Sequence, residues 1–166
     1  MFQKFFWMFI CFLLQTSFTG FMAVGNAMPN FVIIGLVLII SKEGPGNGIK
    51  TGIVAGLFQD LISGAAFGTG LIVKVLDGFL IGLLKRQTFS DNLISKAAIG
   101  IIVTLSDGLA SLLILYFTAG SFNIGGAFFL RVLPNALYTG IIIFVLLVAG
   151  SLFEPNSKKA TRIYGV

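Results

Sequence analysis

The residues of this sequence that could do chemistry are the charged groups inside its apolar runs. They are Asp60, Lys74, Asp77, Asp107 and Arg131. An ionisable group at membrane depth costs at least about 2.5 kcal/mol on insertion scales, so it normally faces a protein interior, a partner or an ion path. Lys74 and Asp77 are three residues apart and can pair on one helix face. In the alternative, Lys74 meets Asp60 of a neighbouring helix, or Asp60 or Asp107 is a proton or ion site. Arg131 is expected near the outer surface, where its side chain can reach lipid headgroups.

We expect no enzyme, no metal site and no cofactor. The sequence lacks His, which removes Ser–His and Cys–His nucleophilic pairs, and the single Cys11 allows no disulfide within the chain. Cys11 lies in an apolar run and is expected to be a buried, inert thiol. Intramembrane aspartyl proteases and the lipoprotein signal peptidase use paired carboxylates. However, neither Asp60 nor Asp107 lies in a Gly-x-Gly-Asp motif, and the peptidase's Asn- and Asp-containing blocks are missing. The glycine-rich stretch 44–48 lacks the Lys-Ser/Thr of a phosphate-binding loop.

The composition indicates a polytopic membrane protein of the all-α class. Of the 166 residues, 57% are hydrophobic and only 10% are charged, with a mean hydropathy of +1.02. These values lie far outside the range of soluble domains. We expect one transmembrane helical domain over residues 1–153 and a basic cytoplasmic tail over 154–166. The net charge of +5 is attributed to cytoplasmic loops and not to nucleic-acid binding, because the 18 Phe residues suit lipid contact better than base stacking.

The apolar runs predict about six transmembrane helices joined by tight loops. The expected spans are 5–20, 28–40, 49–63, 71–84, 93–118 and 128–153. The first span also resembles a signal peptide, but we expect it to be retained as a helix, since continuous spans follow it. The second is short for a full crossing, so it extends backwards along the chain or the bilayer thins around it.

The distribution of basic residues predicts that both termini are cytoplasmic. With six spans, nine basic residues fall on one side of the membrane: Lys4, Lys42, Lys50, Lys85, Arg86, Lys96, Lys158, Lys159 and Arg162. The opposite connections, 21–27, 64–70 and 119–127, contain no Lys or Arg. Because positive loops remain in the cytoplasm, we expect a multi-pass protein of the cytoplasmic membrane, in contact with the lipid bilayer.

A ridge of small residues organises the middle of the chain. Its members recur every four residues: Gly48, Gly52, Gly56, Asp60, Gly64 and Gly68. The next span carries a similar series: Gly70, Lys74, Gly78 and Gly82. Positions four apart lie on one helix face, and small residues let helix backbones approach closely in lipid. The two ridges therefore predict a helix-packing or partner interface, with Asp60 as a polar anchor. They also leave open an association of two copies as a homo-oligomer.

Two sequence blocks give the chain a resemblance to the MreD family of bacterial rod-shape membrane proteins. The first is PNF at 29–31, which opens the second span, and the second is GIVAGLFQDL at 52–61, followed by Gly64 and Gly68. The second block is similar to the family's Gly-x-x-x-Gly-Leu-x-x-Asp region in place and order. The surroundings of Asn135 in the last span are compatible with the family. The Lys74–Asp77 pair has no assigned counterpart in it.

The resemblance implies a non-enzymatic scaffold of the cell-elongation machinery. MreD proteins act with MreC, and through it with the MreB filament, RodA and a class B penicillin-binding protein, in peptidoglycan synthesis. The family is also similar in fold to the substrate-binding S components of energy-coupling-factor vitamin transporters, which gives the alternative function. That alternative needs an outward polar pocket, for which Asn123, Arg131 and Asn135 are the clustered candidates.

Overall fold

The computed structural model describes residues 2–23, 25, 27–63, 68–87, 93–119 and 124–153. These residues form helices and their connections, with no β-strand among them. In chain order the elements are α1 (Phe2–Phe18), α2 (Phe31–Glu43), the 3₁₀ turn η1 (Pro45–Asn47), α3 (Gly48–Ser63), α4 (Thr69–Gln87), α5 (Leu93–Ala119), α6 (Ile124–Ala127), the π-helical turn η2 (Phe128–Val132) and α7 (Leu133–Phe153). The all-α class expected from composition is confirmed. The tail 154–166 lies outside the described residues.

Each of the six predicted spans corresponds to a helical segment, with shifts of a few residues at the ends. The second span differs most, because α2 begins at Phe31 and not at Met28. Asn30 ends the preceding extended segment by accepting the Ile33 N–H with its Oδ1 at 3.1 Å, a typical N-cap contact. In the sixth span, α6, η2 and α7 follow one another without interruption from Ile124 to Phe153.

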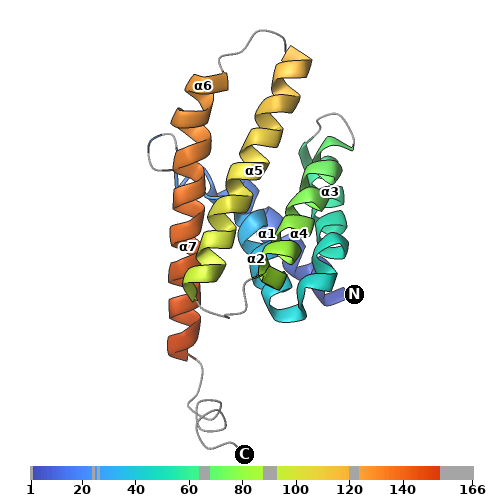
Figure 1. The fold of residues 1–166 in the computed structure, drawn as a ribbon, viewed down its shortest axis with the longest axis vertical. Helices are drawn as coiled ribbons and strands as arrows, with labels where there is room; N and C mark the ends of the chain where they lie inside the picture. The colour runs from blue at the N-terminus through green and yellow to red at the C-terminus, as the bar shows by residue number, and fades with distance from the viewer. Residues whose placement is uncertain are drawn as a thin grey trace, which may run out of the picture.

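The central element of the bundle is α2. Its side chains Ile33, Leu36, Val37 and Ile40 are fully buried, and it contacts α1, α3, α4, α5 and α7. A helix that is apolar all round is expected to be surrounded by other helices. Around it, α3 packs most extensively on α4, and α5 on α7, so two hairpin-like pairs flank the central helix (Figure 1).

The helices differ strongly in length. The helix α2 has 13 residues and α3 has 16, whereas α5 has 27. At 1.5 Å per residue these lengths correspond to roughly 20, 24 and 40 Å. In the part of the chain that the structure describes, two segments are long and apolar enough to cross a membrane, Leu93–Thr118 and Gly125–Ser151. In Figure 1, α5 and the α6–α7 stretch accordingly extend beyond the α3–α4 pair.

The described basic loop residues gather at one end of the bundle. Lys42 lies in the last turn of α2, Lys85 and Arg86 in the last turn of α4, and Lys50 and Lys96 near the starts of α3 and α5. This end lies at the bottom of Figure 1. The separation of charge is the one that a six-span topology requires. The cytoplasmic placement of this end stays a prediction.

Candidate functional site: a buried polar junction beside a glycine contact

The glycines of the predicted ridge lie against the backbone of the neighbouring helix. A Cβ atom added to Gly52 would lie 2.4 Å from the Lys74 carbonyl oxygen, and one added to Gly56 would lie 2.5 Å from the Leu71 Cα. Gly48 and Gly78 face each other, since a Cβ on either one would approach the other's carbonyl oxygen to 2.2 Å. The helices α3 and α4 therefore touch backbone to backbone.

The remaining members of the ridges have different surroundings. Gly82 contributes its Cα to the same contact, 3.5 Å from the position of a Cβ on Gly48. Gly68 precedes α4 with φ of +101° and has open space where a Cβ would be, so its role is conformational. Gly64 lies outside the described residues. The small-residue faces of α3 and α4 thus cover each other and do not lie open to a second protein.

Asp60 holds the start of α4. Its Oδ2 accepts the backbone N–H groups of Gly68 and Leu71 at 2.9 and 3.1 Å, and its Oδ1 accepts that of Gly70 at 2.8 Å. The first N–H groups of a helix have no partner within the helix, and a carboxylate there also interacts favourably with the helix dipole. The buried Asp60 is therefore a cap contributed by a neighbouring helix. The alternative in which Lys74 meets Asp60 is wrong.

Lys74 is the centre of a buried ion cluster. Its Nζ lies 3.0 Å from Asp77 Oδ2 on the same helix and also donates to Asp107 Oδ1 of α5. The side chains are 2% exposed for Lys74, 2% for Asp77 and 13% for Asp107. The local Lys74–Asp77 pair predicted from their spacing is present, and Asp107 joins it from across the bundle. One ammonium group thus faces two carboxyl groups from two different helices.

Asn30, at the start of α2, connects this cluster to the other helices. Its Nδ2 donates to Asp107 Oδ2 at 3.2 Å, while its backbone N–H donates to Thr139 Oγ1 of α7 at 3.1 Å. The neighbouring Phe31 N–H donates to Gln15 Oε1 of α1 at 2.7 Å. Five of the helices thereby meet in one polar network, called the polar junction below: Gln15, Asn30, Lys74, Asp77, Asp107 and Thr139.

Asn135 and Arg131 have different surroundings in the structure. Asn135 Oδ1 accepts the Met28 N–H at 2.7 Å, which ties the connection before α2 to α7. Arg131 is exposed on the π-helical turn η2, whose Val132 is buried instead. Val132 packs against α5 at Gly108, where an added Cβ would lie 2.4 Å from its Cγ1. Asn123, the third residue of the cluster expected for the alternative function, lies outside the described residues.

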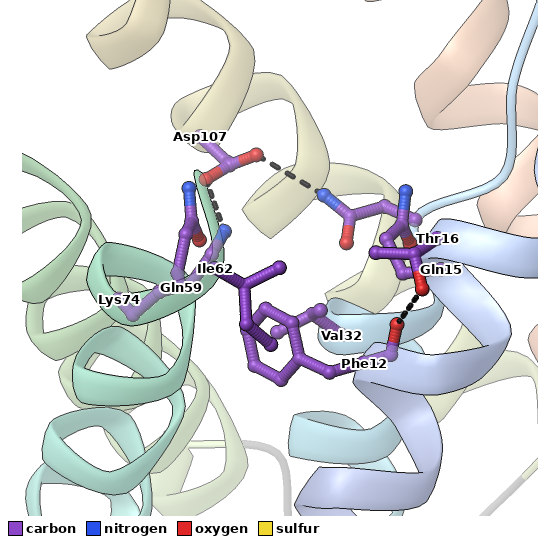
Figure 2. A pocket seen from close by; sticks show the side chains of 9 residues that line it. Phe12, Gln15, Thr16, Val32, Gln59, Ile62, Lys74 and Asp107 are labelled. Carbon is purple, nitrogen blue, oxygen red and sulfur yellow. Dashed lines mark hydrogen bonds and ion pairs between the residues drawn. The ribbon is translucent and has the colours of Figure 1, made fainter. Parts of the chain in front are cut away.

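A cavity of about 290 Å³ adjoins the polar junction. Figure 2 shows that its walls come from several helices, with the Lys74 and Asp107 head groups on one side and Gln15 and Thr16 on the other. The complete lining is Phe12, Gln15, Thr16, Asn30, Val32, Gln59, Ile62, Lys74 and Asp107. Thr16 and Ile62 are exposed and mark the opening between α1 and α3. The cavity thus has polar groups on two sides, with the apolar side chains of Phe12, Val32 and Ile62 between them.

Sequence reasoning did not identify Gln15, Asn30 and Thr139 as junction residues. Asn30 had a detectable signal, since an Asn directly before an apolar helical run is a typical N-cap. Gln15 and Thr139 are single polar residues in apolar runs, and nothing local distinguishes them from lipid-facing polar residues. In the described part of the chain, no group of three or more His, Cys, Asp or Glu could hold a metal ion. The arrangement pairs charges and satisfies backbone groups.

The described residues thus form an all-helical bundle with two long apolar segments and a buried cluster of paired charges, an arrangement compatible with a membrane protein. The family model for the rod shape-determining protein MreD matches residues 1–153, so this chain belongs to the MreD family. Comparison with curated proteins and with solved structures gave no match. The MreD family is membrane-associated, acts in rod-shape determination and is not a known enzyme family. The expected fold similarity to vitamin-transporter S components stays a prediction.

Proposed function

We propose that this protein is a non-enzymatic scaffold of the cell-elongation machinery, spanning the cytoplasmic membrane six times with both termini in the cytoplasm. It docks MreC and through it connects the MreB filament with RodA and a class B penicillin-binding protein. The observation that carries this proposal is the family match over residues 1–153. The collection of Lys42, Lys85 and Arg86 at one end of the bundle supports the orientation.

The polar junction supports a structural interior. Lys74, Asp77 and Asp107 are paired with one another, and Asp60 is bonded to backbone N–H groups. Paired or capped charges hold helices in a fixed arrangement, which is what a scaffold needs from its core. The chemistry of the interior therefore favours positioning of partners over a reaction.

The docking surface is proposed to lie on exposed apolar side chains and not on the glycine faces. The glycine faces of α3 and α4 are occupied by each other. In contrast, α1 exposes Phe6, Trp7, Phe9 and Leu13, which are each at least 44% accessible. Aromatic side chains are common anchors of protein interfaces. A partner helix in the membrane would thus meet aromatic and aliphatic side chains on the outside of the bundle.

Affinity purification of the tagged protein from native membranes in a mild detergent tests this function. We expect mass spectrometry to identify MreC together with wall synthases, all absent from a purification of the untagged strain. Depletion of the protein is expected to convert rods to round cells. Recovery of an ATPase module with a bound vitamin, and without MreC, would replace the scaffold by a transporter component.

A further inference from the structure

The helices α1 and α3 are short for a membrane crossing. Starting from the basic end of the bundle, their 17 and 16 residues extend roughly 26 and 24 Å. The hydrocarbon core of a bilayer is about 30 Å thick. The helix α5 is longer, and Figure 1 shows that it continues beyond the end of α3. In the six-span placement proposed above, the outer ends of α1 and α3 therefore lie below the outer surface of the bilayer.

The connection from α1 to α2 lies at this depth and is not helical. It ends at Asn30, which bonds Asp107 near the middle of α5. Three of its described residues, Phe21, Gly25 and Met28, are exposed. Exposed non-helical backbone is not found in the hydrocarbon of a bilayer, and occurs at membrane depth only inside protein or beside water. The exposure of this connection therefore favours water over lipid at the outer ends of α1 and α3.

The cavity of about 290 Å³ opens at the same level. Thr16 and Ile62, the exposed residues at its mouth, lie in the last turns of α1 and α3. The mouth is thus at the helix ends that are remote from the basic end. A water molecule takes up about 30 Å³ in the liquid, so the cavity has room for several of them.

Two carboxamides that line the cavity have hydrogen-bonding groups to spare. Gln15 Oε1 accepts the Phe31 N–H, which fixes the orientation of the amide and leaves its two Nε2–H donors free. Among the described residues, neither Gln15 Nε2 nor the Gln59 carboxamide has a protein partner, whereas every fully buried side-chain N or O atom has one. Gln15 and Gln59 lie on opposite sides of the cavity (Figure 2). Amides at membrane depth need partners, so the content of the cavity has to supply them.

The charged groups of the cavity give no preference for an ion. Lys74 and Asp107, the cation and the carboxylate of its lining, bond each other. The second oxygen of Asp107 accepts Asn30 Nδ2 at 3.2 Å. The groups that remain are uncharged amide donors and acceptors. Water both donates and accepts hydrogen bonds, and it is bound stably where two to four polar groups surround it.

We propose that water fills this cavity and that the cavity is the inner end of an aqueous vestibule, which opens between α1 and α3 to the outer side of the membrane. Gln15 and Gln59 bind the water, and the Lys74–Asp107 pair borders it. Small polar solutes thereby reach an ion pair at membrane depth from outside. The proposal goes beyond the scaffold function and rests on the six-span placement that the scaffold function includes.

The reaction of single cysteines with a membrane-impermeant thiol reagent tests the vestibule. The full-length Cys11→Ala protein in sealed right-side-out membrane vesicles is the background. The probe is 2-(trimethylammonium)ethyl methanethiosulfonate, which reacts with thiolates in water. We expect Gln59→Cys to be modified from outside, detected as a mass shift. Leu109→Cys is the matched control, because Leu109 lies two residues from Asp107, is 43% exposed and does not line the cavity. Lipid is expected to cover it and to prevent its modification.

Two variants at the mouth locate the path of the reagent. Ile62→Trp narrows the opening and is expected to slow the modification of Gln59→Cys at least about tenfold, or about 1.4 kcal/mol in activation free energy. Thr16→Trp, at the opposite edge, is expected to act in the same way. Leu61→Trp is the control and should leave the rate unchanged, because Leu61 is 72% exposed on the same helix and does not line the cavity.

Two results would overturn the vestibule: modification of Gln59→Cys no faster than that of Leu109→Cys, or a rate that neither mouth variant lowers. Lys50→Cys, at an exposed position of the basic end, reports the orientation and should react only in inside-out vesicles. Its modification from outside would contradict the outward opening.

Capture of MreC, measured on the same vesicles, separates this proposal from the scaffold function. If MreC is captured but Gln59→Cys is not modified from outside, the vestibule is wrong and the scaffold function stands. If Gln59→Cys is modified as expected but MreC is not captured, the scaffold function is wrong and the vestibule stands.

Discussion

Two contacts hold this bundle together in opposite ways. Between α3 and α4, glycines such as Gly52 remove side chains so that backbones touch. Between α4 and α5, Lys74 and Asp107 place charged side chains in the interior. The first contact has no room for an added atom, and the second leaves two carboxyl groups without a cation when Lys74 is replaced. Helices in lipid thus associate either through close approach or through polar groups that have no better partner.

The two contacts also differ in what they contribute. Close backbone approach gains dispersion energy over a long face of α3 and α4. Burial of the ion cluster costs desolvation, which the pairing of Lys74 with Asp77 and Asp107 has to offset. The cluster therefore adds less to stability than its hydrogen bonds suggest. Its contacts determine which helices meet at the polar junction, since Lys74 of α4 and Asn30 before α2 both bond Asp107 of α5.

The largest effect is expected from Lys74→Met, which leaves Asp77 and Asp107 close together without a cation. Breaking a buried ion pair from one side typically costs about 3–5 kcal/mol. We expect a loss of this size in the free energy of unfolding, measured by SDS titration in mixed micelles. The triple variant with Asp77→Asn and Asp107→Asn should recover much of it, because no uncompensated charge remains. If the triple variant is as unstable as Lys74→Met, the loss of stability comes from altered packing and not from the uncompensated charge.

A smaller loss is expected from Gly52→Ala in the glycine contact. The added Cβ meets the Lys74 carbonyl oxygen at 2.4 Å, and this atom belongs to the backbone of α4 and cannot rotate away. Overpacking of this kind costs about 1–3 kcal/mol. Gly150→Ala is the control, because nothing lies within 4 Å of its added Cβ. The same SDS titration measures both, and equal stabilities would mean that α3 and α4 can separate without penalty.

Asp60 combines the two kinds of contact. It is a charged group, and it accepts backbone N–H groups at the start of α4, the helix that packs on α3 through glycines. Asp60→Asn keeps an acceptor oxygen but loses the charge, and it should cost about 1 kcal/mol. Asp60→Leu leaves the N–H groups of Gly68, Gly70 and Leu71 without this acceptor, and its larger loss should appear as faster hydrogen exchange at these amides. Unchanged exchange in Asp60→Leu would contradict the capping role.

The helices and their packing ridge could be predicted from the sequence because both are local patterns. Apolar runs determine where helices form, and a four-residue glycine repeat needs only one helix to be recognised. The predicted second span begins at Met28, three residues before the first residue of α2. In the structure Asn30 is the N-cap and Phe31 begins the helix.

The polar junction could be predicted only in part, because it depends on distances between helices. The Lys74–Asp77 pair lies within one helix and followed from its spacing. The contact of Lys74 with Asp107 joins residues 33 positions apart, and that of Asn30 with Thr139 joins residues 109 apart. The arrangement of the helices determines which of these residues meet, and no local sequence pattern indicates it. The same reason explains why the alternative contact between Lys74 and Asp60 could not be decided from the sequence, and Asp60 caps α4 instead.

The smallest effect is expected from Lys85→Met, which tests a polar contact at the edge of the bundle against the one at its centre. Lys85 Nζ donates to the carbonyl oxygens of Ile40, at 3.3 Å, and Ser41 near the end of α2. A cation at a helix C-terminus is worth about 0.3–1 kcal/mol near solvent. The loss should decrease at high salt, which screens accessible charges, whereas the loss in Lys74→Met should persist. Arg86→Met, at an exposed position of the same turn, is the control. If Lys85→Met lowers the free energy of unfolding as much as Lys74→Met does, the difference in burial between the two lysines does not determine their contributions to stability.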